Sequence, residues 1–319
     1  MDSIVQIPPC LDEARPLWSV LIPCFNCADF LRFTLEAVLD QDLGPEFMEI
    51  IVVDDCSTRD DPQAVVDKLG HGRVRFLRQP SNVGKVLNYE TGLLASKGRL
   101  IHQLHGDDVV LPGFYQAMAA AFDAFPEAGA FFCESDYIDE SGAITGRTGR
   151  ERRSTGILES WLPRIASAQL VQTPSMVVRR EVYETLGGFD RRLDCSEDWE
   201  MWIRIANQFP VGFCSEARAQ YRTTVGNNST RSILNGKRGR VQRKMFEIID
   251  SYLPADVVQG TQKVRARGQA LFFADQVAKV MRLQGFHGWQ NLCREVLRHS
   301  ADLFVVRRLV SLTIRELLK

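Results

Sequence analysis

The sequence predicts an α/β protein with a mostly parallel sheet flanked by helices, followed by a C-terminal helical region. Three observations support this fold class. Short apolar runs rich in β-branched residues, such as WSVLIP and MEIIVV, alternate with stretches of helical periodicity through the first half of the chain. This alternation is typical of a parallel sheet that helices cover on both faces. From about Lys237 onward the pattern is helical only, and the 319 residues suffice for one large domain or two modest ones.

The elements of the first half follow from local patterns. Trp18 begins an apolar run that breaks at Pro23, and the stretch after it spaces its apolar residues as one face of a helix does. Gly98 follows a later helical stretch as a stop signal. We predict strands at Trp18–Pro23, Met48–Val53, Val74–Leu77, Leu100–Leu104 and Ala130–Cys133, and helices at Ala28–Asp40, Pro62–Leu69, Val83–Ala95 and Phe114–Phe125.

The second half is less regular. Tyr137–Ile144 predicts a hairpin with its turn at Ser141-Gly142, and the Arg-rich stretch Gly146–Thr155 predicts a flexible loop. Val177–Val178 is expected to continue the sheet. The remaining predicted helices are Glu181–Leu186, Ser196–Phe209, Val241–Tyr252, Val264–Leu283, Trp289–His299 and Asp302–Leu318.

Composition excludes several classes of protein. Apolar residues make up 45% and charged residues 25% of the chain, which is ordinary for a globular protein and unlike a disordered or fibrous one. The net charge of −1 gives no indication of nucleic-acid binding. The first residues lack the basic and apolar regions of a signal peptide, and the eight scattered cysteines favour the reducing cytoplasm.

Charge is unevenly distributed along the chain. From Lys237 onward sixteen Lys or Arg residues stand against seven Asp or Glu, whereas 23 basic and 33 acidic residues precede it. The last stretch, Asp302–Lys319, mixes bulky apolar residues with Arg307, Arg308 and Arg315. A basic amphipathic helix of this kind can lie on an anionic membrane, or it can pack on the catalytic part of the chain or on a second subunit.

Pairs of adjacent carboxylates follow two of the predicted strands. Asp54-Asp55 comes directly after the second strand, and Asp107-Asp108 comes shortly after the fourth, in HGDD. Ligands of parallel α/β sheets bind beyond the carboxyl ends of the strands, so both pairs are expected at one edge of the sheet, together with Pro23 and Asn26. Like charges placed there need a cation or solvent to offset their repulsion.

Five stretches resemble, in this order, the GT-A glycosyltransferases of family 2: WSVLIPCFN, VVDDCSTRD, NVGKVLNYETGLLASKG, LHGDDVVLPGF and LGGFDRRLDCSEDWEMW. The resemblance covers roughly Trp18 to Thr230. It implies a GT-A, Rossmann-like catalytic domain over residues 18–236, between an N-terminal extension (residues 1–17) and a C-terminal helical region (residues 237–319). It also implies transfer of a sugar from a nucleotide-diphospho-sugar donor to an acceptor.

The resemblance implies a divalent-metal site in the HGDD loop. A cation bound to protein carboxylates and to the donor diphosphate stabilises the leaving negative charge, and Mg²⁺ and Mn²⁺ prefer oxygen ligands. The first acid of the family's Asp-x-Asp motif is replaced here by His105. We therefore expect Asp107 as the direct ligand, Asp108 in support and His105 as a substitute ligand. Asp108 alternatively caps the turn before Pro112.

The resemblance also assigns residues to the nucleotide-sugar. A carboxylate accepts hydrogen bonds from a base or a ribose, which is the expected role of the acidic pair after the second strand. Simpler explanations are a helix cap for Asp55, a turn for Gly84 and a surface position for Lys85. The expected nucleotide-sugar-binding residues are Pro23, Asn26, Asp54, Asp55, Asn82, Gly84, Lys85, Asp107 and Arg222.

The acceptor side needs a general base, because an alcohol is a poor nucleophile until its proton is removed. In LDCSEDWEMW the resemblance places Glu197 and Asp198 at the family's catalytic acidic pair, with Asp198 as the base. Alternatively, these acids only stabilise a helix that starts after Ser196 as its N-cap. Trp199 and Trp202 share one helical face, and we expect them either to stack on the acceptor sugar or to pack in the core.

One further departure from the family concerns the stretch Tyr221-Arg222-Thr223-Thr224. In the family a histidine near the metal or diphosphate often follows Tyr-Arg, and Thr224 stands in its position. Together with His105 this implies a lighter metal shell than is usual in the family.

The sequence therefore predicts an inverting glycosyltransferase of cell-surface polysaccharide or glycolipid synthesis. The alternatives are a sugar-nucleotide nucleotidyltransferase and a catalytically inactive sugar- or nucleotide-binding relative. PCFNCAD has no glycine, whereas nucleotidyltransferases carry a Gly-rich loop after the first strand. Expected partners are a nucleotide-sugar donor and a saccharide or lipid-linked acceptor, but no nucleic acid. Peripheral membrane contact through the C-terminal helix and a homodimer are open expectations for a cytoplasmic protein.

Overall fold

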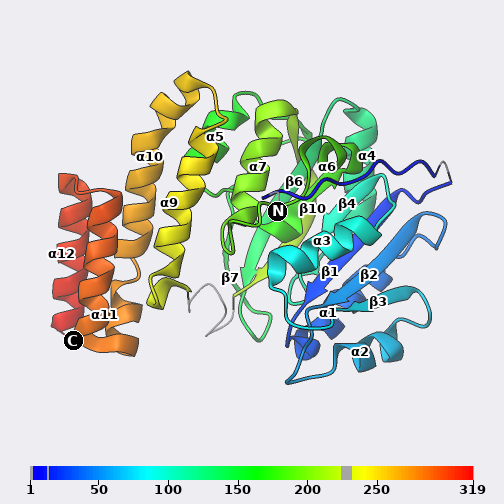
Figure 1. The fold of residues 1–319 in the computed structure, drawn as a ribbon, viewed down its shortest axis with the longest axis horizontal. Coiled ribbons are helices and arrows are strands. Elements are labelled where there is room, and N and C mark those ends of the chain that lie inside the picture. The colour runs from blue at the N-terminus through cyan, green and yellow to red at the C-terminus, as the bar shows by residue number, and fades with distance from the viewer. Residues whose placement is uncertain (1–2, 13, 224–231, 319) are drawn as a thin grey trace. The chain divides into compact units, whose positions relative to one another are not determined.

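The computed structural model describes residues 3–12, 14–223 and 232–318. The chain forms two compact units (Figure 1). The first comprises Met1–Trp161 and Leu170–Thr224, and the second comprises Leu162–Gln169 and Val225–Lys319. The domain boundaries predicted after residues 17 and 236 stay predictions.

Within the described residues, the first unit is built on a ten-stranded sheet. Its main path runs β3-β2-β1-β4-β9-β6-β10-β5, with β7 paired to β6 and β8 to β10. Neighbours β3, β2, β1 and β4 are parallel, and so are β6 and β10, whereas β9 runs antiparallel between β4 and β6. The strands are β1 (Trp18–Cys24), β2 (Met48–Asp54), β3 (Val74–Arg78), β4 (Leu100–Gln103), β5 (Val109–Val110), β6 (Ala130–Ile138), β7 (Ile144–Arg147), β8 (Gly156–Ile157), β9 (Met176–Arg179) and β10 (Val211–Arg222).

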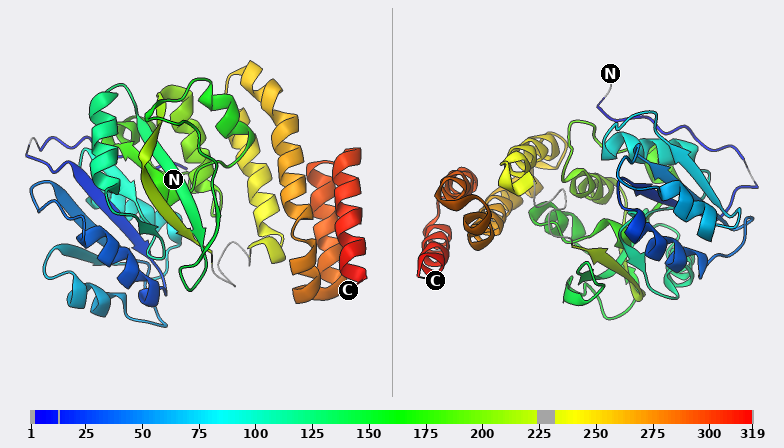
Figure 2. Two further views of the ribbon diagram at one scale, coloured as in Figure 1. Left: turned by 180° about the vertical axis from the view of Figure 1, so that it is seen from behind. Right: turned by 90° about the horizontal axis from the view of Figure 1, so that it is seen from below.

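Helices cover both faces of this sheet, as Figures 1 and 2 show. Alternate residues of β1, Trp18, Val20 and Ile22, share one apolar core with α1, α2 and α4. On the opposite face α3 lies with Gly92 against Leu21 and Val53. The predicted α/β class with a mostly parallel sheet is confirmed. The helices of this unit are α1 (Ala28–Leu39), α2 (Pro62–Leu69), α3 (Lys85–Ala95), α4 (Phe114–Ala124), the short η1 (Thr173–Ser175), α6 (Arg180–Leu186) and α7 (Glu197–Gln208).

The register brings the predicted acidic segments to one edge. Cys24 of β1 pairs with Asp54 of β2, and Leu21 of β1 pairs with Gln103 of β4. Since these parallel strands end side by side, the segments that follow them meet at the same edge. The hydroxyl of Thr34, on α1, donates to the backbone carbonyl of Asp108 at 2.8 Å and anchors the loop after β4.

The structure differs from the predictions mainly in the second half of the sheet. The hairpin is confirmed, but its first strand, β6, starts at Ala130 and is longer than expected. The expected loop Gly146–Thr155 begins inside strand β7, where Arg147 forms an ion pair with Asp136 at 2.5 Å. Strand β10 was not predicted. Its register shifts between Cys214 and Arg218, which interrupts the alternation that would identify a strand.

The described helices of the second unit bury a small apolar core between α10, α11 and α12. The predicted helix Val264–Leu283 was wrong, because the chain breaks at Asp275 and a new helix starts at Val277. Gly285, with φ of 62°, interrupts that helix. Among the described residues no helix is both long and apolar enough to cross a membrane. The helices are α5 (Trp161–Ser167), α9 (Lys237–Asp250), α10 (Ala255–Ala274), α11 (Val277–His299) and α12 (Leu303–Leu317).

Replacing Gly98 by alanine is expected to destabilise the first unit. A Cβ atom at Gly98 would lie 2.4 Å from the backbone nitrogen of Ser19 and 2.5 Å from the carbonyl carbon of Trp18, so β1 would have to move. Overpacking of this kind typically lowers the free energy of unfolding by about 1–3 kcal/mol. Urea unfolding of Gly98→Ala measures the loss. Gly149→Ala is the control, because a Cβ there meets no atom within 4 Å, and equal stability of the two variants would contradict the close-approach argument.

Candidate active site

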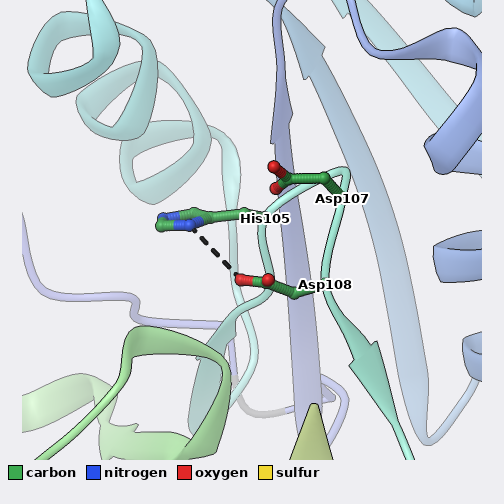
Figure 3. A group of neighbouring side chains, drawn as sticks. All are labelled: His105, Asp107 and Asp108. Carbon is green, nitrogen blue, oxygen red and sulfur yellow. Dashed lines mark ion pairs between the residues drawn. The ribbon is translucent and has the colours of Figure 1, made fainter. Parts of the chain in front are cut away.

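Three side chains that can hold a cation project from the loop between β4 and β5. Figure 3 shows His105, Asp107 and Asp108 extending from this loop toward the same side. Each offers one ligand atom, and these atoms lie within 4.8 Å of one another. The carboxylate of Asp108 is buried. Its Oδ1 accepts a hydrogen bond from the backbone N–H of Arg222 at 2.8 Å, and its Oδ2 lies 3.5 Å from Nδ1 of His105.

The electrostatics of this loop fit a bound divalent cation. Burial and the neighbouring Asp108 raise the pKa of Asp107 to about 6. Oδ2 of Asp108 is buried and accepts no hydrogen bond from the described residues. Both observations indicate negative charge that the protein itself does not fully offset. Carboxylate oxygens suit Mg²⁺ and Mn²⁺, whereas an imidazole is a poorer ligand for Mg²⁺ than for a transition metal, so the donor set is consistent with a divalent metal.

His105 has a second contact that orients its ring. Its Nε2 lies 2.8 Å from the hydroxyl of Tyr89, and the two rings stack with centroids 5.5 Å apart. Burial lowers the pKa of His105, but the carboxylates of Asp108 and Asp107 outweigh burial, so the pKa is raised overall. Since Nε2 faces Tyr89, Nδ1 is the ring nitrogen that faces Asp108.

Arg222 supports the same loop rather than extending away from it. Its Nε donates to the backbone carbonyl of Asp107 at 2.9 Å, and its Nη1 donates to the carbonyl of Asp139 at 2.8 Å. The guanidinium carbon lies 4.8 Å from the ring centroid of Phe30. These contacts show Arg222 bracing the loop that carries Asp107; its predicted contact with the donor stays a prediction. Thr224 lies outside the described residues.

The two carboxylates at the end of β2, Asp54 and Asp55, face different partners. Asp54 is fully buried, accepts hydrogen bonds from the backbone N–H of Ser57 at 3.1 Å, and forms an ion pair with Arg78 at 3.2 Å. Asp55 accepts hydrogen bonds from the N–H of Val83 at 2.7 Å and of Gly84 at 3.0 Å. Asp55 is therefore no helix cap; it holds the loop before α3, and its pKa is raised, mainly by burial.

Asn26 and Asn82 complete this network. Oδ1 of Asn26 accepts hydrogen bonds from the backbone N–H groups of Thr58 and Arg59, both at 2.9 Å. Nδ2 of Asn82 donates to Asp55 at 3.0 Å. Helix α2 is capped instead by Asp61, whose carboxylate accepts from the N–H of Ala64. The predicted nucleotide-binding residues thus lie together and shape the loops after β1, β2 and β3, with Pro23 at the end of β1.

Lys85 lies against the predicted catalytic pair. Its Nζ is 2.7 Å from Oε1 of Glu197, whose side chain is only 2% exposed. Burial lowers the pKa of Lys85, but the carboxylates of Glu197 and Asp198 outweigh burial and the net pKa is raised. Burial and Asp198 raise the pKa of Glu197 in spite of the opposing effect of Lys85. The Lys85 side chain is 40% exposed, but its ammonium group is paired with a buried carboxylate, unlike that of a plain surface lysine.

Asp198 sits in the first turn of α7. Its Oδ1 accepts a hydrogen bond from the N–H of Trp199 at 2.8 Å, and its Oδ2 accepts one from the hydroxyl of Thr173 at 3.2 Å. Ser196 occupies the N-cap position with a left-handed φ of 62°, but its side chain forms no capping hydrogen bond. The expectation that Ser196 is the N-cap residue is confirmed, and three acids, Glu197, Asp198 and Glu200, lie in the first turn of the helix.

The structure corrects the expectation of acceptor stacking for the two tryptophans. Trp199 is 0% and Trp202 is 2% exposed. Stacking on a sugar requires an exposed ring face, and neither ring presents one in this structure. Trp202 instead packs edge-on to Phe189, with ring centroids 6.1 Å apart. Both residues belong to the core beneath the helix that carries Asp198, which is the alternative the sequence left open.

Helix α3 brings the acidic segments together. Lys85 in its first turn contacts Glu197, and Tyr89, one turn later, contacts His105. The residue before the helix, Gly84, is held by Asp55. Three carboxylate-bearing segments that are distant in sequence therefore meet around one helix start.

Two residues of this arrangement were missed in the sequence. Tyr89 follows Lys85 by four positions, which places both on one helical face, so the spacing offered a signal. Thr173 offered none, since only the fold brings it to Asp198.

Comparison with known proteins identifies the family. The model of the family "Glycosyl transferase family 2" matches residues 19–187, which is more than half of the chain. The uncharacterized protein MT1568 of Mycobacterium tuberculosis is 29% identical over 269 residues, which cover 80% of this chain and 82% of that protein.

Solved structures show the same fold. The structure of Staphylococcus aureus TarS 1–349 in complex with UDP-GlcNAc has a TM-score of 0.64 at 16% identity, over 94% of this chain and 88% of that one. The mannosyltransferase PcManGT of Pyrobaculum calidifontis, in complex with GDP-Man and Mn²⁺, has a TM-score of 0.61 at 16% identity, over 99% of this chain and 90% of that one. The family match and this fold confirm the resemblance of the five sequence stretches, and the chain belongs to glycosyltransferase family 2.

Proposed function

We propose that this glycosyltransferase transfers a sugar, with inversion at the anomeric carbon, from a nucleotide-diphospho-sugar to an acceptor hydroxyl. One observation carries the proposal: the first turns of α3 link the predicted catalytic pair to the predicted metal loop. Lys85 contacts Glu197 at 2.7 Å, and Tyr89 contacts His105 at 2.8 Å. An inverting transfer needs a base and a leaving-group site close together, on opposite sides of the reacting carbon.

In this proposal Asp198 is the general base. Its carboxylate accepts the proton of the acceptor hydroxyl, and the acceptor oxygen forms a bond to the anomeric carbon. The bond from that carbon to the diphosphate breaks, and its electron pair leaves with the nucleoside diphosphate. Thr173 holds Oδ2 of Asp198 by a hydrogen bond at 3.2 Å, which fixes the direction of the carboxylate.

The leaving group is assigned to the loop after β4. His105, Asp107 and Asp108 would hold a divalent cation, which supplies positive charge for the departing diphosphate when it is bound. Mn²⁺ is the preferred proposal over Mg²⁺, because one of the three ligands is an imidazole. Arg222 braces the backbone carbonyl of Asp107 and so holds this loop in place.

The donor is proposed to be a UDP- or GDP-sugar. TarS and PcManGT, which share the fold, are solved with UDP-GlcNAc and GDP-Man. The loops held by Asp55 and Asn26 are proposed to contact the base and ribose, with Asp54, Asn82, Gly84 and Pro23 completing that surface. Membership in family 2 argues against a nucleotidyltransferase. The proposed acceptor is a saccharide or a lipid-linked saccharide of a cell-surface polymer or glycolipid.

Helix α12 is proposed to lie on an anionic membrane surface. Its buried side, Val305 and Leu309, faces the helical core, whereas Leu303, Val310, Ile314 and Leu317 are exposed. Arg307 and Arg315 line the same surface as Val306, Val310 and Ile314. The apolar side chains would contact the acyl chains, and the adjacent arginines would contact the anionic headgroups. The helix would then lie in the plane of the membrane surface.

Asp198→Asn is expected to abolish most of the transfer activity. An amide cannot accept the acceptor proton, and loss of a general base lowers kcat by roughly 10²–10⁴-fold. Release of nucleoside diphosphate measures the rate, and NMR of the product tests inversion. Asp123→Asn, an exposed position on α4, is the control. A wild-type kcat in Asp198→Asn would remove this residue as the base, and a retained anomeric configuration would remove the inverting mechanism.

A nucleotide-sugar is expected to raise the melting temperature more strongly with Mn²⁺ than without it. At a concentration of 100 Kd a ligand stabilises the folded state by about 2.7 kcal/mol. The screen compares UDP-GlcNAc, GDP-Man and a TDP-sugar, each with and without Mn²⁺. Asp107→Asn should lose the Mn²⁺-dependent part of the shift. An unchanged Mn²⁺ effect in that variant would argue against this loop as the metal site.

Sedimentation with vesicles tests the role of α12. The full chain should sediment with vesicles that contain anionic lipid and much less with purely zwitterionic ones. Arg307→Glu with Arg315→Glu should weaken sedimentation, and so should Val310→Ser with Ile314→Ser. If the apolar variant leaves sedimentation unchanged but dissociates a dimer in light scattering, the face is a contact between two copies.

A further inference from the structure

Lys85 occupies a junction between the two halves of the proposed site. It is the first residue of α3 and directly follows Gly84, whose N–H is held by Asp55 at 3.0 Å. From there its side chain reaches the first turn of α7, where Nζ lies 2.7 Å from Glu197. One residue thus joins the loop after β3 to the helix that carries Asp198.

The Glu197 carboxylate depends on this contact. Its side chain is 2% exposed, and its Oε2 has no hydrogen-bond partner among the described residues. If the ammonium group is removed, water cannot easily replace it, because the carboxylate is buried. In a surface ion pair, by contrast, either charge can be solvated at little cost in free energy. The neighbouring Asp198 adds a second negative charge, which further favours the charged ammonium form of Lys85.

The segment on the other side of Lys85 is equally constrained. Gly84 has a φ of 87°, a conformation that favours glycine, and Asp55 accepts hydrogen bonds from two consecutive N–H groups of the loop, those of Val83 and Gly84. The Lys85 backbone is therefore fixed relative to β2 independently of its side chain. The ion pair with Glu197 therefore holds the start of α7 in place relative to β2.

We propose that Lys85 is a positioning residue, which aligns the Glu197-Asp198 turn with the donor loop instead of binding the donor phosphates. The inference rests on the proposed base role of Asp198. Without the ammonium group, Glu197 keeps its buried position only by taking up a proton or by moving, and either change displaces Asp198, the next residue. Donor contacts made by the backbone of the 82–84 loop would remain, because Asp55 holds them.

Steady-state kinetics of four variants tests this inference: Lys85→Met, Lys85→Arg, Glu197→Gln and the double variant Lys85→Met/Glu197→Gln. The substrate is the nucleotide-sugar that gives the largest thermal shift. Lys85→Met should lower kcat roughly 100-fold, the usual effect of a misplaced catalytic group, with donor KM changed less than about threefold. Lys85→Arg should keep more activity than Lys85→Met, since it keeps the positive charge.

The double variant guards against misfolding. It replaces the ion pair by two neutral side chains of similar size, so it removes the unpaired buried charge that could unfold Lys85→Met. If the two residues act as one unit, its loss of kcat will be close to that of the worse single variant rather than the product of the two losses.

Lys97→Met is the matched control, because Lys97 follows the other end of α3 and is largely exposed. A donor KM that rises tenfold or more with unchanged kcat would make Lys85 a phosphate ligand and overturn the inference. A loss of kcat in the double variant that equals the product of the two single losses would overturn the inference as well. Wild-type kinetics in Lys85→Met would also overturn it. The proposed base role of Asp198 is tested separately: it would be overturned if the Asp198→Asn variant kept wild-type activity.

Discussion

The structure of the site depends on one constraint: buried carboxylates collected at one edge of a sheet each need a partner. Asp54 has Arg78, and Asp55 has two backbone N–H groups. Glu197 has Lys85. In the loop after β4, His105 and a single N–H from Arg222 leave one oxygen of Asp108 without a hydrogen bond from the described residues, as one oxygen of Glu197 also is. This loop also gathers three possible ligand atoms within 4.8 Å of one another, which is consistent with a divalent cation there.

Helix α3 connects the segments that carry these carboxylates. Its first turn contacts α7 through Lys85, its second turn contacts the metal loop through Tyr89, and the glycine before it is held by Asp55. A helix is stiff over this length, so the relative positions of its contacts are set by its backbone. The imidazole of His105 also fits this arrangement, since its Nε2 lies 2.8 Å from the Tyr89 hydroxyl and its Nδ1 lies 3.5 Å from Asp108.

The sequence anticipated the site better than the details of its chemistry. The acidic pairs were expected at one edge because they follow parallel strands, and they lie there. The roles of single side chains were harder to predict. Trp199 and Trp202 belong to the core, and Arg222 braces a loop, because burial and hydrogen-bond partners depend on residues far away in the chain. Strand β10 escaped prediction since a register shift broke its alternation.

The sequence by itself determined the fold class, the family and the segments that carry the chemistry. Periodicity and the order of motifs are local properties, so they can be read without coordinates. Only the tertiary structure decided which groups meet. The contact of Lys85 with Glu197 joins residues 112 positions apart, and that of Thr173 with Asp198 joins segments of unrelated pattern. Side-chain partners across such separations are set by strand order and helix packing, which no local pattern encodes.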